Sequence, residues 1–407
     1  MRFGVRGSLT PISLTPISIP TALGPLAFDA RYQRQHAGLL LTGRHHQKRL
    51  AIAFGAGTPE GGILFHGWLM QYKASTLRLE RDFNTTPNRR EKSEGGGIWQ
   101  GGAGLAADSH GSIYFTTGNG DNDPGSFGNS IIKLTPARRW CRRFFRAAVF
   151  DAKLDDDPAN AMYWQKSDID LGSGGVTVIP GANRVIGGGK TGVLYLLDSG
   201  ASASLPKVQS FEAFSSAYEI DPAMIKQLRY GNWYGGPHLH GAPTHWRSDQ
   251  DTSYIYHWGE TDYLKRFTYR WATGMIDLTA TMKGPIKADN CFGAPPGIPC
   301  PMPGGMISLS ANRASNGIVW ATLPVETSDG KGRDFAFDAL TLAKLWETLV
   351  PKVAHWIPPT IADGKVIVAT GCNEFRVYDI SSTAVADPVG QQCPPAPSPH
   401  RAPSHVR

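Results

Sequence analysis

The stretch GGAGLAADSHG at residues 101–111 is followed by SIYFTTGNG at 112–120 and NSIIKLTP at 129–136. A start rich in small residues leads through a turn into a β-branched and aromatic run, and a third apolar segment follows. Short runs of this kind with turn residues between them predict an antiparallel meander of strands. A single meander cannot bury both of its faces, so it needs neighbours of the same type.

The same pattern recurs along the chain. Later copies start at Gly172, His240, Gly304 and Pro358, and a degenerate copy at 36–77 precedes them all. Meanders stacked around a common axis form a propeller, whereas a parallel α/β fold would need crossover helices that this sequence lacks. The sequence therefore predicts an all-β fold, a β-propeller of about six blade-like units, and leaves open whether the ring is complete or incomplete.

The composition agrees with many short strands joined by tight turns. The chain has 407 residues with 47 Gly and 30 Pro, only 18% of the residues are charged, and the net charge is +7. Basic residues crowd 44–49 and 138–146, but no nucleic-acid motif accompanies them, so no nucleic-acid partner is expected. No apolar run approaches the roughly 18 residues of a membrane span, and no signal peptide is visible at the N-terminus.

Three regions are expected along the chain. Residues 1–29 repeat Leu-Thr-Pro-Ile-Ser and are expected to be low-complexity or disordered sequence. Residues 30–385 form the propeller, and residues 386–407 are a Pro-rich tail expected to be disordered.

The five cysteines form no CxxC pair, which makes a zinc ribbon unlikely on spacing. Cys291 and Cys300 bracket a Pro/Gly loop and are the first candidate for a disulfide. Cys372 and Cys393 are a weaker candidate pair, which leaves Cys141 over. This pattern mildly favours an oxidising compartment.

Residues 337–346, FDALTLAKLW, resemble the tryptophan docking motif of propellers built from pyrroloquinoline-quinone-like (PQQ-like) repeats. The matching positions are Asp338, Thr341 and Trp346. The resemblance implies that the Asp caps the turn amides and that the Trp fills the seam between adjacent blades.

Other blocks, such as GGGIWQGGAGLAAD at 95–108 and GGGKTGVLYLLD at 187–198, are similar to a family of large secreted bacterial propellers with no settled activity. The similarity covers roughly residues 30–380 and implies an extracytoplasmic location, periplasmic or secreted. Members of that family carry further N-terminal blades, so this chain is expected to be truncated or remodelled there. We therefore expect it to be either unstable alone or closed by an N-terminal strand.

The residues at or just before the start of each repeat are expected to line the rim of the central channel. These rim candidates are Trp99, Gln100, Asp170, His238, His240, His355 and Trp356.

The two histidines His238 and His240 alternate along an extended segment, so their side chains share a face. With Asp170 or His355 they can hold a metal such as zinc or copper. The alternative is that they hydrogen-bond loop carbonyls at the channel mouth. The nearby Glu260 and Asp262 are expected to cap their turn.

The resemblance also makes a quinone cofactor, PQQ with calcium, possible. Trp99, Trp258 or Trp356 can then serve as a floor for the quinone and Asp170 as a base, but vicinal cysteines and a local pattern of calcium ligands are missing. The leading hypothesis is a scaffold that binds a protein, small-molecule or carbohydrate ligand at the rim. The alternatives are a quinoprotein dehydrogenase that oxidises alcohols or sugars, and another enzyme such as a lyase or hydrolase.

Overall fold

The computed structural model describes most of the expected repeat region. The described residues are 18–19, 26–30, 32–43, 47–56, 65–87, 95–120, 125–136, 141–146, 170–200, 204–214, 238–248, 252–288, 303–324, 331–354, 356–372 and 374–379. Cys291, Cys300 and His355 lie outside them, so the predictions on these residues stay predictions.

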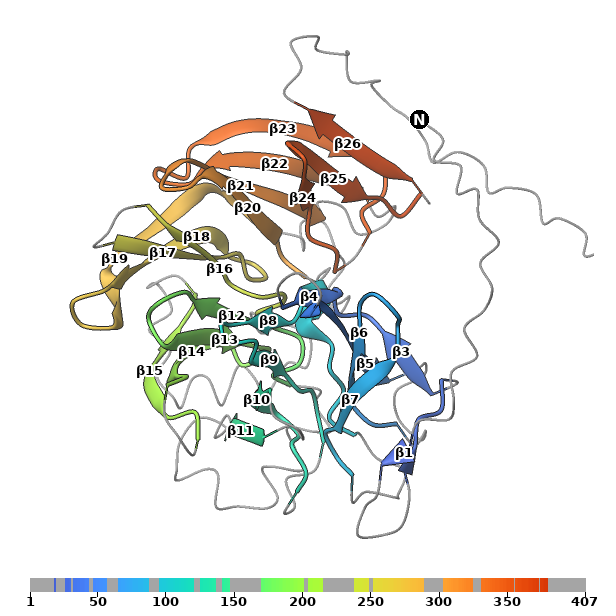
Figure 1. Ribbon diagram of the computed structural model, residues 1–407. Coiled ribbons are helices and arrows are strands. Elements are labelled where there is room, and N and C mark those ends of the chain that lie inside the picture. Colours follow the sequence, from blue (N-terminus) through green and yellow to red (C-terminus); the bar gives the residue numbers. More distant parts are fainter. Residues whose placement is uncertain are drawn as a thin grey trace, which may run out of the picture.

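Six antiparallel sheets, called blades 1 to 6 in chain order, fan around a common centre (Figure 1). Blades 1 and 2 contain β3 (Gln33–Gln35), β4 (Leu40–Thr42), β5 (Arg49–Ala56), β6 (Trp68–Lys73) and β7 (Leu79–Asn84), then β8 (Ala106–Ala107), β9 (Ile113–Thr116), β10 (Ser130–Thr135) and β11 (Cys141–Arg146). Blades 3 and 4 contain β12 (Val176–Ile179), β13 (Arg184–Gly188), β14 (Val193–Asp198) and β15 (Lys207–Glu212), then β16 (Thr244–Arg247), β17 (Thr252–His257), β18 (Tyr263–Arg270) and β19 (Met275–Lys287). Blades 5 and 6 contain β20 (Met306–Asn312), β21 (Ser315–Pro324), β22 (Gly332–Asp338) and β23 (Lys344–Val350), then β24 (Thr360–Ala362), β25 (Lys365–Ala369) and β26 (Phe375–Asp379). The all-β propeller of six blades is thus confirmed, and each predicted repeat start precedes the innermost strand of a blade.

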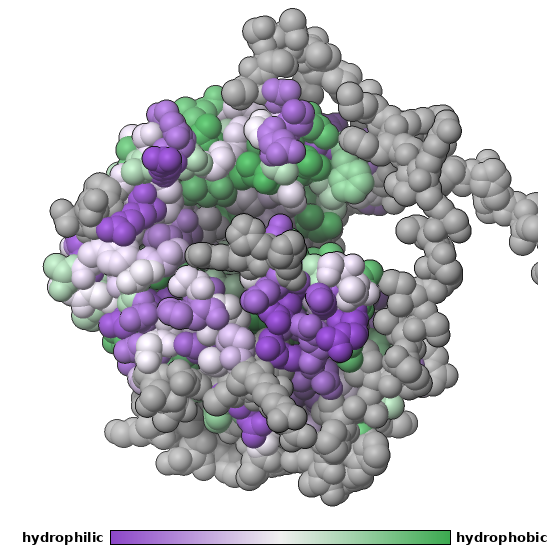
Figure 2. Space-filling view, viewed as in Figure 1, coloured by the Kyte–Doolittle hydropathy of each residue, from purple (hydrophilic) through white to green (hydrophobic). Residues whose placement is uncertain are grey.

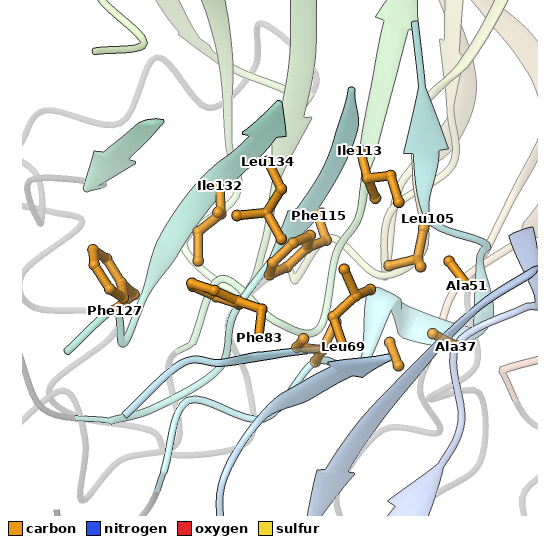
Figure 3. Close-up of a cluster of buried hydrophobic side chains, with 12 residues drawn as sticks. Ala37, Ala51, Leu69, Phe83, Leu105, Ile113, Phe115, Phe127, Ile132 and Leu134 are labelled. Carbon is orange, nitrogen blue, oxygen red and sulfur yellow. The ribbon is translucent and has the colours of Figure 1, made fainter. Parts of the chain in front are cut away.

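The strands of a blade are apolar on both faces because each face meets a different neighbour. In β9, Ile113 and Phe115 pack against blade 1, whereas Tyr114 between them packs against blade 3. This follows from the alternation of side chains along a strand. Figure 3 shows the seam between blades 1 and 2, where the Phe83 and Phe115 rings lie 6.2 Å apart. Burying one such side chain contributes about 1.5–3 kcal/mol, and only a neighbouring blade provides that burial.

The residues of the expected docking motif lie at the seam between blades 5 and 6. Asp338 Oδ1 accepts hydrogen bonds from the backbone N–H of Leu340 (3.0 Å) and of Thr341 (2.8 Å) and from the Thr341 hydroxyl (2.8 Å). The Trp346 ring meets the Tyr378 ring of β26 edge to face, with centroids 4.8 Å apart. The Tyr378 hydroxyl in turn donates to Asp334 Oδ2 at 2.8 Å. These contacts join β22 and β23 of blade 5 to β26 of blade 6.

A tight turn fills the centre of the ring. The short 3-10 turn η2 (Gln100–Gly102) has positive φ at all three residues. A Cβ added at Gly101 would overlap the Ser173 carbonyl and the Gly241 amide, and one at Gly102 would overlap the Trp356 carbonyl. The turn of blade 2 therefore touches the starts of blades 3, 4 and 6, and only glycine allows this approach.

Blade 6 has three strands, and no strand of the described part pairs with the outer edge of β26. Its face away from blade 5 carries Phe375 and Val377, which are 76% and 53% exposed. In the space-filling view, hydrophobic residues gather above a hollow between blade 6 and blade 1 (Figure 2).

The N-terminal strands do not extend blade 6. The strands β1 (Ser18–Ile19) and β2 (Leu26–Ala27) pair with each other. Just after them, the Phe28 ring packs on Phe54 and Trp68 of blade 1, with centroids 4.9 and 5.7 Å away. Part of the region expected to be disordered thus covers blade 1, because Leu26 and Phe28 meet its otherwise open apolar face. The described residues contain no helix with the length and apolarity that a membrane crossing needs.

Replacing Gly102 by Ala should lower the free energy of unfolding by about 3 kcal/mol or more, because strain at positive φ adds to a clash with the Trp356 backbone. Gly364 is the matched control, since it also has positive φ but no atom lies within 4 Å of an added Cβ. Gly364→Ala should cost only about 1–2 kcal/mol. Urea unfolding of both variants measures the difference, and equal losses would contradict the filled centre.

Replacing Phe375 and Val377 by Ser should reduce self-association while changing the free energy of unfolding by no more than about 0.5 kcal/mol, because both side chains are exposed on β26, whose outer edge pairs with no described strand. Light scattering against protein concentration measures the effect. Leu278→Ser, at a 45% exposed position in β19, is the control. An equal decrease in self-association for Leu278→Ser would contradict a specific contribution of the face that carries Phe375 and Val377.

Candidate functional site

A group of ionisable side chains in the described part of the chain lies on one rim of the propeller, in blades 3 and 4. In an antiparallel blade, the start of the first strand and the turn between the second and third strands lie at the same end. His238 and His240 precede β16, and Glu260 is in the turn between β17 and β18. Asp170 and Lys190 hold the two corresponding positions in blade 3. We call these five residues the rim site.

The two histidines and Glu260 are in direct contact. His240 Nε2 lies 2.7 Å from Glu260 Oε1, and His238 Nδ1 lies 3.3 Å from Glu260 Oε2. The backbone holds the two segments together, since the Glu260 N–H donates to the His238 carbonyl at 3.0 Å. The His238 N–H donates to Glu260 Oε2 at 3.3 Å. Their side chains are nearly buried, at 15% exposed for His238, 0% for His240 and 8% for Glu260.

Burial sets the electrostatics of this group. It raises the pKa of Glu260 to about 7, and the nearby charges of His238 and Lys190 oppose the rise. Lys190 itself pairs with Asp170, with 3.2 Å between Nζ and Oδ1. The rim site thus brings alternating charges together in a nearly dry environment, where a charge partner is worth more than at the surface.

The cavity beside the rim site is small. It has a volume of about 20 Å³, room for about one water molecule. Its lining combines the starts of blades 2, 4, 5 and 6, through Ala103, His240, Gly241, Gly305 and Pro358. The inner strands of these blades therefore converge on one point, as the repeat pattern predicts.

The other predicted rim residues make different contacts in the structure. Gln100 is buried and donates from Nε2 to the Thr116 hydroxyl at 2.7 Å, so it holds the central turn. The ring of Trp99 packs against the backbone of Gly55, Gly97 and Gly118. Trp356 lies on His240, with ring centroids 4.5 Å apart.

Glu260 and Asp262 make different contacts, although both were expected to cap their turn. Asp262 pairs with Lys265 at 2.6 Å, whereas Glu260 faces the imidazoles. In the metal hypothesis Glu260, rather than Asp170, is the third group beside His238 and His240. The sequence signal that finds Glu260 and Lys190 is their place in the second-to-third-strand turns, which lie on the same rim as the strand starts.

A third histidine, His245, follows His238 and His240 in the chain but lies outside the rim site. It lies in β16 opposite Ile255. Burial lowers the pKa of His245 to about 4, and the charge of Arg247 acts in the same direction. This histidine is therefore neutral in the folded protein at neutral pH.

His245 should make the protein less stable in acid. Between pH 6.5 and 4 the unfolded chain binds a proton at this position and the folded chain does not, so the free energy of unfolding falls as the pH falls through that window. His245→Gln should reduce this loss, as measured by urea unfolding at pH 7 and at pH 4.5. His110→Gln, in an exposed turn, should keep the loss of the parent. An unchanged loss in His245→Gln would contradict the assignment.

Comparison with known proteins finds only similarities of shape to solved structures. No family model and no curated protein matches it. A quinohemoprotein alcohol dehydrogenase from Pseudomonas putida HK5 is similar at 14% identity and a TM-score of 0.44, over 81% of this chain and 55% of the dehydrogenase. BamB from Moraxella catarrhalis is similar at 12% identity and a TM-score of 0.39, over 89% of this chain and 84% of BamB. The Dos1 propeller is similar at 11% identity and a TM-score of 0.45, over 86% of this chain and 72% of that one.

These likenesses carry no argument about activity. The chain spans 55% of the length of the dehydrogenase, and all three identities are low. The function is therefore argued from the residues of this chain.

Proposed function

We propose that the protein is an extracytoplasmic propeller of the PQQ-like type that binds a protein, small-molecule or carbohydrate ligand through the rim of its centre. The observation that carries the proposal is the rim site, where five ionisable side chains from two blades meet in nearly complete burial. Burying charges costs free energy, and strongly shifted ionisable groups gather at functional sites more often than elsewhere.

A quinone cofactor fits the described residues poorly. Trp258 is fully buried, its N–H donates to the Asp262 carbonyl at 2.9 Å, and the Gly305 backbone packs on its ring. Asp170, the expected base, is paired with Lys190.

Two features support the PQQ-like repeat type and the extracytoplasmic location. Asp338 accepts the Thr341 N–H within its turn, and the Trp346 ring meets Tyr378 of the next blade. Cys372 is disulfide-bonded, and disulfides persist mainly in oxidising compartments.

Adding PQQ and calcium to the purified protein separates binding from quinone-dependent oxidation. We expect no saturable change in quinone absorbance and no dye-linked oxidation of alcohols or sugars, since the described centre is filled. Saturable uptake together with such oxidation would replace the binding proposal by the dehydrogenase.

Binding at the rim is tested by reversing one charge. Lys190→Glu should abolish retention of partners from an extracytoplasmic protein fraction and from a glycan panel, because it places a second acid beside Asp170. The control is Arg313→Glu, an exposed residue in the first-to-second-strand turn of blade 5, at the opposite rim. Retention that survives in Lys190→Glu, or no retention by the parent, would contradict the proposal.

A further inference from the structure

The contact between His238, His240 and Glu260 offers three metal-ligating atoms. These atoms all lie within 4.8 Å of one another. In a tetrahedral zinc site with bonds of about 2.0–2.2 Å, ligand atoms lie roughly 3.3–3.5 Å apart. The histidine nitrogens lie 2.7 Å from Oε1 and 3.3 Å from Oε2 of Glu260, so the two carboxylate oxygens face the two imidazoles. An ion can therefore replace the hydrogen bond between His240 and Glu260 when the three side chains adjust to tetrahedral spacing.

We propose that His238, His240 and Glu260 bind one divalent transition-metal ion, with zinc the best match. The donor set carries the choice of metal, because two imidazole nitrogens and one carboxylate oxygen suit zinc and related ions. Calcium and magnesium prefer oxygen donors alone.

The supporting contacts hold the three ligands in place. The bond from the Glu260 N–H to the His238 carbonyl and the bond from the His238 N–H to Glu260 Oε2 fix the relative position of the two residues before any ion binds. The Trp356 ring covers His240 at 4.5 Å, which shields the site from solvent on one side. Lys190, whose charge would oppose a cation, is neutralised by Asp170 at 3.2 Å. Groups that orient and shield the ligands strengthen metal binding.

Three protein ligands are also typical of zinc sites that keep a position for water or for a bound molecule. His238 is the most exposed of the three side chains and marks the side from which solvent reaches the ion. The metal site stands on these contacts and does not depend on whether a partner binds at the rim.

The full-length chain, stripped with chelator and then dialysed against excess zinc, tests the inference by elemental analysis. We expect one zinc ion per chain after gel filtration. Cobalt substitution should give the intense visible absorption of a four- or five-coordinate ion rather than the faint spectrum of the hydrated ion. These two readouts need no variant, so they hold even if a substitution prevents folding.

Variants identify the ligands. Glu260→Gln and His240→Ala should weaken zinc binding by more than about 100-fold, because loss of an outer partner alone costs about 10- to 100-fold. His110→Ala, at an exposed turn, should bind like the parent. The absence of stoichiometric zinc in the parent would overturn the inference, and so would equal losses in His110→Ala and Glu260→Gln. Loss of zinc with retained partner binding would leave the proposed function standing without the metal.

Discussion

The structure depends on one packing constraint, that each blade buries both faces of its strands and only adjacent blades can cover them. The alternation of Ile113, Tyr114 and Phe115 sends neighbouring side chains into two different seams. The same constraint brings the inner strands together at the centre. There the Gly101 and Gly102 backbones touch three other blades, and side chains would keep them apart.

The repeat pattern was sufficient to predict the six blades, because strand alternation and turn residues are local properties of the sequence. It did not predict the filled centre. Gln100 was expected at a ligand-binding rim, yet positive φ at Gln100, Gly101 and Gly102 folds this segment inward. Such a path depends on contacts with distant blades, which no local pattern encodes. Among the described strands none pairs with the outer edge of β26, and the sequence left open whether an N-terminal strand closes the ring.

The rim site was predicted in part. His238 and His240 were found because residue alternation places them on one face, and they are in contact with the same carboxylate. Glu260 was expected to cap a turn, because a carboxylate in a turn satisfies local amides in most sequences. Its direction toward the histidines is set by the register between β17 and β18, which the sequence alone does not reveal. A buried group of this kind costs stability, which favours a role in binding over a role in packing.

The most direct measurement of the packing constraint is amide hydrogen exchange in β25 and β21. Both are second strands that pair on both sides, with β24 and β26 for the first and with β20 and β22 for the second. The two strands differ in how their sheets are covered. A neighbouring blade packs on each face of the sheet that contains β21, whereas the sheet that contains β25 has one face on which Phe375 and Val377 are exposed. We expect faster exchange in β25 than in β21. Equal protection of the two strands would contradict the claim that neighbouring blades provide the stability of each sheet.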